Sequence, residues 1–97
     1  GRVTGRAKVI HDPRSAHLEA GEILVAPATN PAWSPLLLAA GGLVTEIGGL
    51  LSHGAIVARE YGLPAVLNVR DATRLIRTGQ RITVDGEAGL VYLEEEA

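Results

Sequence analysis

The chain has 97 residues, enough for one domain around one hydrophobic core. A formal net charge of -2 gives no sign of a nucleic-acid partner or an acidic membrane partner, and the absence of cysteine excludes disulfides, thiolate metal sites and a cysteine nucleophile. No apolar run approaches the ~20 residues that span a bilayer, so we expect no membrane partner and a cytoplasmic location. Because the chain begins with Gly1 rather than Met, we expect it to be part of a longer protein.

Six short apolar runs, each bounded by glycine, proline or polar residues, are typical of β-strands. In the first run Val3 and Val9 fall on one side of a period-2 pattern, and in the fifth Ile82 and Val84 do the same. The predicted strands cover residues 3–10, 22–26, 43–45, 64–67, 81–85 and 90–93. A turn at residues 85–86 is expected to join the last two as a hairpin.

Four short segments between the strands are predicted to be helical. Ser34 followed by Pro35 indicates a helix with Ser34 as its N-cap, and Asp71 is the expected cap of another helix. The predicted helices cover residues 16–20, 35–40, 53–61 and 72–76. Short strands alternating with short helices predict a compact α/β fold, in which residues 1–97 form a single domain.

The most unusual segment is a glycine loop that leads into the predicted helix 53–61. Gly48 and Gly49 form the loop, and Ser52 is the expected N-cap of the helix. Because residues 55–58 are apolar and surround most of the helix, we expect the helix to be largely buried.

His53 is the candidate reactive group, because it stands at the predicted N-terminus of this helix. Unpaired N–H groups and the positive end of the helix dipole favour an anion there and disfavour an imidazolium, so we expect a neutral ring at pH 7. A neutral imidazole beside a phosphate-binding loop is suited to nucleophilic attack on phosphorus. From the residues alone, a structural histidine that caps the helix or fills the core is the stronger interpretation.

Other familiar sites do not fit the chain. A nucleophile elbow, G-x-S-x-G, is excluded because Leu50 stands two residues before Ser52, and a P-loop is excluded because Ala55 follows the glycine after His53. His11, Asp12 and His17 carry metal-ligating side chains in one polar loop, but their spacing matches no familiar metal motif. We therefore expect no metal site in this domain.

Residues 45–66, T-E-I-G-G-L-L-S-H-G-A-I-V-A-R-E-Y-G-L-P-A-V, resemble the signature of the phosphohistidine swivelling (mobile) domain of phosphoenolpyruvate-utilising enzymes. The family pattern runs roughly T-[DE]-x-G-G-x-x-[ST]-H-x-A-I-x-A-R-E-x-G-[IL]-P-A-V. G-E-I-L-V at 21–25, N-P-A-W-S-P-L at 30–36 and the closing segment 79–91 extend the resemblance over most of the chain. It implies a swivelling β/β/α fold. Leu51 departs from the threonine that is usual in dikinases and phosphoenolpyruvate synthases, so regulation by phosphorylation of that residue is excluded.

The resemblance also implies a function and a set of site residues. His53 would accept a phosphoryl group that originates from ATP on a nucleotide-binding domain and deliver it to an acceptor, pyruvate or another small molecule, on a further domain. Gly48 and Gly49 would let the backbone approach the phosphoryl oxygens or form only a tight turn. Ser52 would donate to a phosphoryl oxygen, cap the helix or do both, and Thr45 would orient the site or only end a strand. The alternative is a non-catalytic interaction module in which His53 is structural.

Cofactors are expected on the partner domains rather than on this one. No Lys or Arg lies within five residues of His53, so the cations that neutralise a phosphoryl group, Mg²⁺ included, and ATP itself are expected from those domains. Arg59, the nearest cation along the chain, lies about 120° around a straight helix from His53, which favours packing or a salt bridge. Trp33 is expected in the core or an interface. We also expect the chain to fold alone and to be monomeric or weakly associating.

Overall fold

The computed structural model describes residues 1–49 and 52–94. Leu51, where the sequence departs from the usual threonine, lies outside the described residues. The described part is a three-layered α/β domain with a six-stranded mixed sheet in the order β4-β3-β2-β1-β5-β6. The strands are β1 (Arg2–Val9), β2 (Ile23–Ala26), β3 (Gly42–Thr45), β4 (Ala65–Val66), β5 (Arg81–Asp85) and β6 (Leu90–Leu93).

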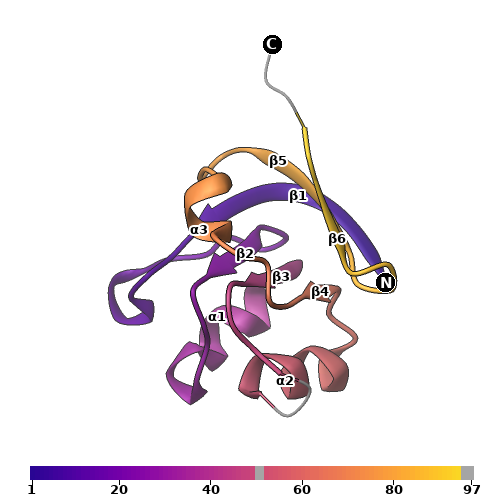
Figure 1. Ribbon diagram of the computed structural model, residues 1–97. Coiled ribbons are helices and arrows are strands. Elements are labelled where there is room, and N and C mark those ends of the chain that lie inside the picture. Colours follow the sequence, from indigo (N-terminus) through magenta and orange to yellow (C-terminus); the bar gives the residue numbers. More distant parts are fainter. Residues whose placement is uncertain (50–51, 95–97) are drawn as a thin grey trace.

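The sheet bends so that its two halves form separate layers. β1 to β4 pair in parallel, whereas β5 pairs antiparallel with both β1 and β6. In Figure 1, β1 and β5 arch over β2, β3 and β4, and two helices lie on the opposite side of these three strands. The predicted β/β/α arrangement is confirmed.

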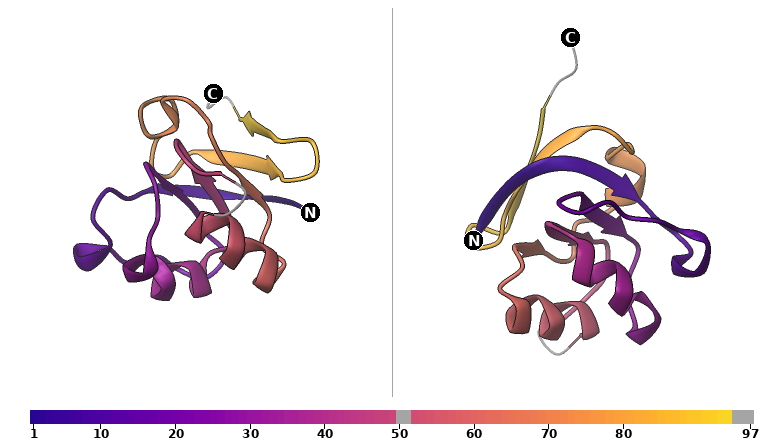
Figure 2. Two further views of the ribbon diagram at one scale, coloured as in Figure 1. Left: turned by 60° about the horizontal axis from the view of Figure 1, so that its bottom comes forward. Right: turned by 180° about the vertical axis from the view of Figure 1, so that it is seen from behind.

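The helices are short. They are the 3-10 helices η1 (Pro13–Ser15) and η2 (Pro31–Trp33) and the α-helices α1 (Ser34–Ala39), α2 (His53–Tyr61) and α3 (Ala72–Leu75). Both views in Figure 2 show α1 and α2 side by side on the same side of the sheet. No helix in the described ranges is long and apolar enough to cross a membrane.

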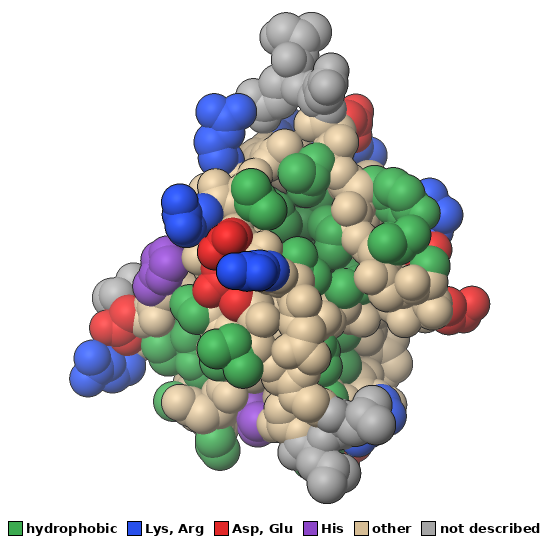
Figure 3. All heavy atoms as spheres, viewed as in Figure 1, with side chains coloured by type: hydrophobic (Ala, Val, Ile, Leu, Met, Phe, Trp, Pro, Cys, Tyr) green, Lys and Arg blue, Asp and Glu red, His purple; other side chains and the backbone are tan. Residues whose placement is uncertain are grey.

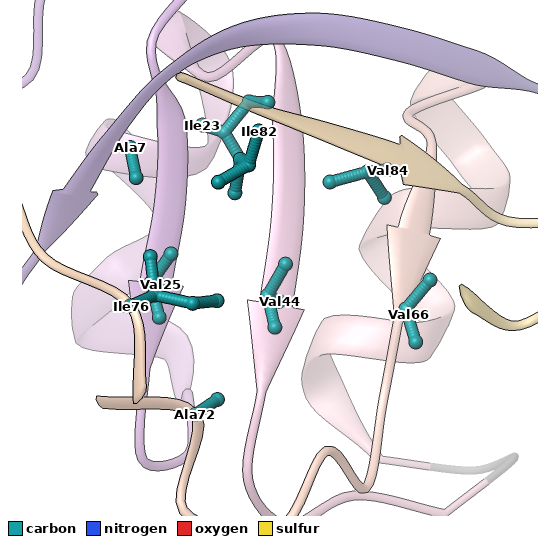
Figure 4. Packing of buried hydrophobic residues seen from close by; sticks show 9 residues of the cluster. All are labelled: Ala7, Ile23, Val25, Val44, Val66, Ala72, Ile76, Ile82 and Val84. Atoms are coloured by element: carbon teal, nitrogen blue, oxygen red, sulfur yellow. The ribbon is translucent and has the colours of Figure 1, made fainter. Parts of the chain in front are cut away.

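Strand alternation divides the core into two clusters. Ile23 and Val25 of β2 and Val44 of β3 point toward β1 and β5, where they pack with Ile82 and Val84 (Figure 4). The residues between them point the other way, because successive side chains of a strand leave opposite faces. β2 and β3 are therefore buried along their whole lengths, as expected for strands covered on two faces.

The second cluster lies under the helices. Leu24 and Leu43 pack there against Leu37 of α1, Trp33 of η2 and Leu18. Trp33 is 4% exposed, so its predicted place in the core is confirmed. This cluster holds α1 and α2 on the sheet and so determines which residues can meet at their N-termini.

The predicted helical turn at residues 16–20 is wrong. The turn forms earlier, as η1, because the Asp12 side chain caps it by accepting from the Arg14 N–H and because Pro13 starts it. Residues 16–19 have no regular structure, and Leu18 from this stretch is 5% exposed in the second cluster.

The predicted cap of α1 is also wrong, since Ser34 is the first residue of the helix rather than its N-cap. The chain enters α1 directly from η2, so Trp33 occupies the cap position and makes no side-chain capping bond. Asn30 instead caps η2 by accepting from Ala32 N–H. The Ser34 hydroxyl is thereby available to another partner.

Two further differences concern caps and turns. Asp71 precedes α3 as predicted, but with φ 59 it lies in the left-handed region and makes no side-chain capping bond. The β5–β6 hairpin is confirmed, but its turn covers residues 86–89, because Gly89 with φ 70 closes it by donating to the Asp85 carbonyl.

The surface mixes charged and apolar side chains. On the face shown in Figure 3, acidic and basic side chains lie among one another with hydrophobic side chains between them. The large hydrophobic residues with exposed side chains include Leu38, Ile47, Leu75 and Tyr61. A surface of this kind matches the small net charge of -2.

Candidate functional site

The candidate site lies at the N-terminus of α2, beside the N-terminus of α1. His53 is half-buried, and each of its ring nitrogens faces a hydroxyl group. Nδ1 lies 3.3 Å from the Thr29 hydroxyl oxygen, and Nε2 lies 3.3 Å from the Ser34 hydroxyl oxygen. The imidazole thus lies between two hydroxyl groups, each of which can donate or accept a hydrogen bond.

The sequence of α2 explains why the helix begins at His53. Ser52 has extended backbone angles and its hydroxyl accepts from the Ala55 N–H at 3.3 Å, so the predicted N-cap is confirmed. At the other end Gly62, with φ 63, terminates the helix in the left-handed conformation. The prediction that the helix is largely buried is wrong: Gly54 and Ala58 are buried, but Ile56 is 41% exposed because only one face packs on the sheet.

Gly54 permits the close packing around the histidine. A Cβ at this position would lie 2.9 Å from the Thr29 hydroxyl oxygen and 3.2 Å from Leu43 Cδ2. Any larger residue would therefore push Thr29 away from His53. This requirement is invisible along the chain, because Thr29 is separated from His53 by 24 positions.

The glycine loop lies between β3 and α2, and most of its polar groups are already paired. Gly48 N–H donates to Asn68 Oδ1 at 3.0 Å, and Asn68 Nδ2 donates back to the Gly48 carbonyl. The Gly49 carbonyl accepts from both the Ser52 hydroxyl at 2.8 Å and the Ser52 N–H at 3.1 Å. The N–H groups of Gly48 and Ser52 are therefore used within the chain.

The two glycines differ in the space around them. A Cβ on Gly48 would meet the Ser52 hydroxyl oxygen at 3.2 Å and the Thr45 hydroxyl oxygen at 3.4 Å, whereas a Cβ on Gly49 would meet no atom of residues 1–49 or 52–94 within 4 Å. Gly48 thus faces inward and Gly49 faces an open space. An approaching group can reach the backbone at Gly49.

Thr45 ends β3 directly beneath this loop. Its side chain is 1% exposed, and its hydroxyl oxygen has no hydrogen-bond partner within the described part of the chain. Together with Thr29, Ser52 and Gly54 it lines a pocket of about 130 Å³ beside the helix N-terminus. The structure therefore places Thr45 and Ser52 around one small pocket next to His53.

Glu46 ties the loop to α3. Its carboxylate accepts from the Thr73 hydroxyl at 2.7 Å and from the Thr73 N–H at 2.9 Å. These hydrogen bonds stabilise the charged form and lower the pKa of Glu46, and the positive charges of His11 and Arg74 act in the same direction. The segment that leads from β3 to the glycine loop is thus attached to the start of α3.

The remaining candidates lie away from His53. Arg59 lines a pocket with Leu63, Pro64 and Glu87 toward the other end of α2. The Asp12 carboxylate is engaged by Arg14, whose hydrogen bonds lower the pKa of Asp12. Among residues 1–49 and 52–94, no group of three or more metal-ligating side chains could hold a metal ion.

Sequence reasoning identified His53, Ser52 and the glycine loop but missed their partners. Ser34 was expected only as a cap, and Thr29, Gly54 and Asn68 were given no role. Asn, Ser, Thr and Gly residues are common near turns and helix ends, so no local signal distinguishes these four. Their roles follow from the packing of η2, α1 and β4 around α2.

Comparison with known proteins adds a further result. The family described as "PEP-utilising enzyme, mobile domain" matches residues 18–89. The chain is 62% identical over 93 residues to a rifampicin phosphotransferase of Streptomyces sviceus, covering 96% of this chain and 11% of that protein. It is 47% identical over 91 residues to a probable phosphoenolpyruvate synthase of Staphylothermus marinus, covering 91% of this chain and 11% of that protein.

A solved structure agrees with this match. The solution structure of an Enzyme I protein superposes with a TM-score of 0.70 at 30% identity, over 81% of this chain and 33% of that one. The chain therefore spans about a tenth of the length of the two curated relatives and about a third of the solved one.

Proposed function

We propose that this chain, which belongs to the family of PEP-utilising enzyme mobile domains, is the phosphocarrier of a larger phosphotransferase. On this proposal His53 carries the phosphoryl group. The observation that carries the proposal is the placement of His53. Its imidazole stands at a helix N-terminus, between two hydroxyl groups and beside a glycine loop with one open side. A nucleophilic nitrogen and an environment suited to an anion meet there.

The two hydroxyl groups suggest which nitrogen reacts. The Thr29 hydroxyl packs so near the Gly54 backbone that a Cβ there would lie 2.9 Å from it, and on this proposal Thr29 is the fixed partner of the ring. With the proton on Nδ1, the ring donates to Thr29 and the lone pair remains on Nε2, where the Ser34 hydroxyl can donate until the phosphoryl group arrives. The Nε2–P bond then forms as the bond from phosphorus to the leaving oxygen breaks. We propose that Thr29 and Ser34 orient the ring for this step.

The transfer depends mainly on positioning and charge, because the transition state of phosphoryl transfer is loose. On this proposal Gly49 offers its open backbone to the phosphoryl oxygens, Gly48 and Ser52 hold that backbone in place, and Thr45 lines the pocket beneath. The α2 dipole stabilises the added charge by about 0.3–1 kcal/mol. This stabilisation is modest, which suits a domain that must pass its phosphoryl group on.

The rest of the reaction is proposed to take place on partner domains. ATP and Mg²⁺ would be bound by a nucleotide-binding domain, whose cations neutralise the phosphoryl group that His53 accepts. The acceptor would be a small molecule on a further domain. The relatives' names include both a rifampicin phosphotransferase and a probable phosphoenolpyruvate synthase, and the higher identity to the former favours an antibiotic hydroxyl over pyruvate.

The proposal is tested by mapping the phosphoryl group. The full enzyme is incubated with ATP labelled at the β- or γ-phosphate, and the acid-labile label is located by peptide mapping. We expect His53→Ala to abolish the label and His17→Ala, at an exposed histidine, to leave it unchanged. Label that persists in His53→Ala would instead leave this domain as a non-catalytic interaction module.

A further inference from the structure

Asn68 has an unusual backbone conformation for its residue type. It follows β4 with φ 61, and Asp71, with φ 59, is the other non-glycine residue with positive φ in the described ranges. The left-handed region is sterically unfavourable for residues with a Cβ, although Asn and Asp tolerate it best. Such a conformation persists where surrounding contacts require it.

The contacts of Asn68 supply that requirement. Its side-chain amide pairs with both backbone polar groups of Gly48, as acceptor from the N–H at 3.0 Å and as donor to the carbonyl. The amide therefore acts like the backbone of a neighbouring strand. It connects two segments that are 20 positions apart in the sequence.

The position of this pairing relates it to the site. Gly48 is followed by Gly49, where the space beside the backbone is open. The Gly49 carbonyl accepts from the hydroxyl of Ser52, which caps the helix that starts at His53. Gly48 is thus held by Asn68, and Ser52 is held by its hydrogen bonds to the Gly49 carbonyl and the Ala55 N–H. The Glu46 carboxylate, held by Thr73, restrains the segment that precedes it.

We infer that Asn68 is a positioning residue for phosphoryl transfer at His53: its amide holds the glycine loop so that Gly49 presents its backbone to the phosphoryl group. This inference rests on the proposed function. Asn68 acts through Gly48 and does not itself touch the imidazole. Its left-handed backbone and its two hydrogen bonds occur together, since the amide reaches Gly48 from a residue with φ 61.

The chain offers a matched pair of variants for the test. Asn68→Gly and Asp71→Gly both replace a non-glycine residue of positive φ by the residue that accepts this conformation most easily. Only the first removes the pairing with Gly48. Phosphoramidate serves as a small anionic phosphoryl donor that acts without other domains, and phosphorylation is followed at His53 itself by the NMR signals of its ring.

We expect Asn68→Gly to slow phosphorylation of His53 about tenfold, which is the effect of roughly one net hydrogen bond, and Asp71→Gly to leave the rate unchanged. Asn68→Asp keeps the acceptor for Gly48 N–H but loses the donor and places a negative charge beside the loop. It should react more slowly than Asn68→Gly, and added salt should restore part of its rate because salt screens the charge. The added charge alone produces this salt dependence, so the loss of rate that remains at high salt, relative to the wild type at the same salt, measures the missing hydrogen bond to Gly48.

The outcomes separate the two proposals. If Asn68→Gly and Asn68→Asp both react at the wild-type rate while the Gly48 amide signal shifts, the loop is released without consequence and the positioning role is overturned. If phosphoramidate leaves the His53 ring unmodified in the folded wild-type chain and the full enzyme keeps its label in His53→Ala, the proposed function itself fails. Should Asn68→Gly prove unfolded by circular dichroism, the rate of Asn68→Asp at high salt decides the question: a rate below that of the wild type supports the positioning role, and an equal rate overturns it.

Discussion

The two ends of α2 are held in different ways. At the N-terminus, the His53 ring contacts the hydroxyls of Thr29 and Ser34, which come from two other segments of the chain. At the C-terminus, Gly62 closes the helix through its own N–H, which donates to the carbonyls of Ala58 and Arg59. Tertiary contacts therefore determine the geometry of the first end, and local backbone conformation determines that of the second. Substitutions at the first end should alter chemistry, and those at the second should alter only stability.

The largest effect is expected from Gly49→Val. The side chain has open space within the domain, so we expect the melting temperature to stay within a few degrees of the wild type. Phosphorylation of His53 should be blocked, because the isopropyl group stands where a phosphoryl group would approach the backbone. Label incorporation from ATP measures this. Gly49→Ala should give an intermediate rate, and full activity in Gly49→Val would show that the loop is only a turn.

The next largest effect is expected when the glycines near the two ends of α2 are replaced by alanine. Gly54→Ala places a Cβ 2.9 Å from the Thr29 hydroxyl oxygen, and overpacking of this kind typically costs about 1–3 kcal/mol. Gly62→Ala strains a left-handed residue and should cost about 1 kcal/mol. Urea unfolding gives both values. We expect phosphorylation to fall in Gly54→Ala beyond what its stability explains and to be unchanged in folded Gly62→Ala; equal rates would contradict the comparison.

Ser52→Ala tests the local helix cap at the N-terminus of α2. The hydroxyl caps α2 and donates to the Gly49 carbonyl, so its loss should cost about 1 kcal/mol of stability. We expect phosphorylation to be weakened and not abolished, because the Thr29 and Ser34 contacts remain. Ser52→Thr keeps the hydroxyl and should restore most of the rate. Complete loss of label in folded Ser52→Ala would make the hydroxyl itself indispensable.

The smallest expected effect is the pH dependence of the stability that Glu46 contributes, in the segment that leads from β3 to the glycine loop. Hydrogen bonds from Thr73 lower the folded-state pKa of Glu46 below its ordinary 4.5. The charged carboxylate therefore contributes stability that is fully present above about 4.5 and is lost as the pH falls through the lower, folded-state pKa. We expect Glu46→Gln to be less stable than the wild type at pH 7, and the difference to shrink toward pH 3. A difference that is constant from pH 7 to pH 3 would contradict the assignment.

Much of the fold was predictable from local patterns. The strand at Arg81–Asp85 and the helix at His53–Tyr61 were predicted correctly, because period-2 alternation, a serine cap and a closing glycine act within a few residues. The turn at 16–20 and the cap at Ser34 were predicted wrongly. In both cases a 3-10 helix formed around a neighbouring proline and shifted the boundary, a competition that periodicity does not resolve.

The sequence by itself determined the family and, through that resemblance, the expected β/β/α arrangement. It also determined the place of His53 at a helix start, which depends on residues close together along the chain. The tertiary structure alone decided which groups surround that histidine. Thr29 and Ser34 reach the ring, and Asn68 reaches Gly48, across sequence separations of 19 to 24. Hydrogen bonds form only within about 3.5 Å, and such distances are set by how η2, α1 and β4 pack on the sheet rather than by any local preference of the chain.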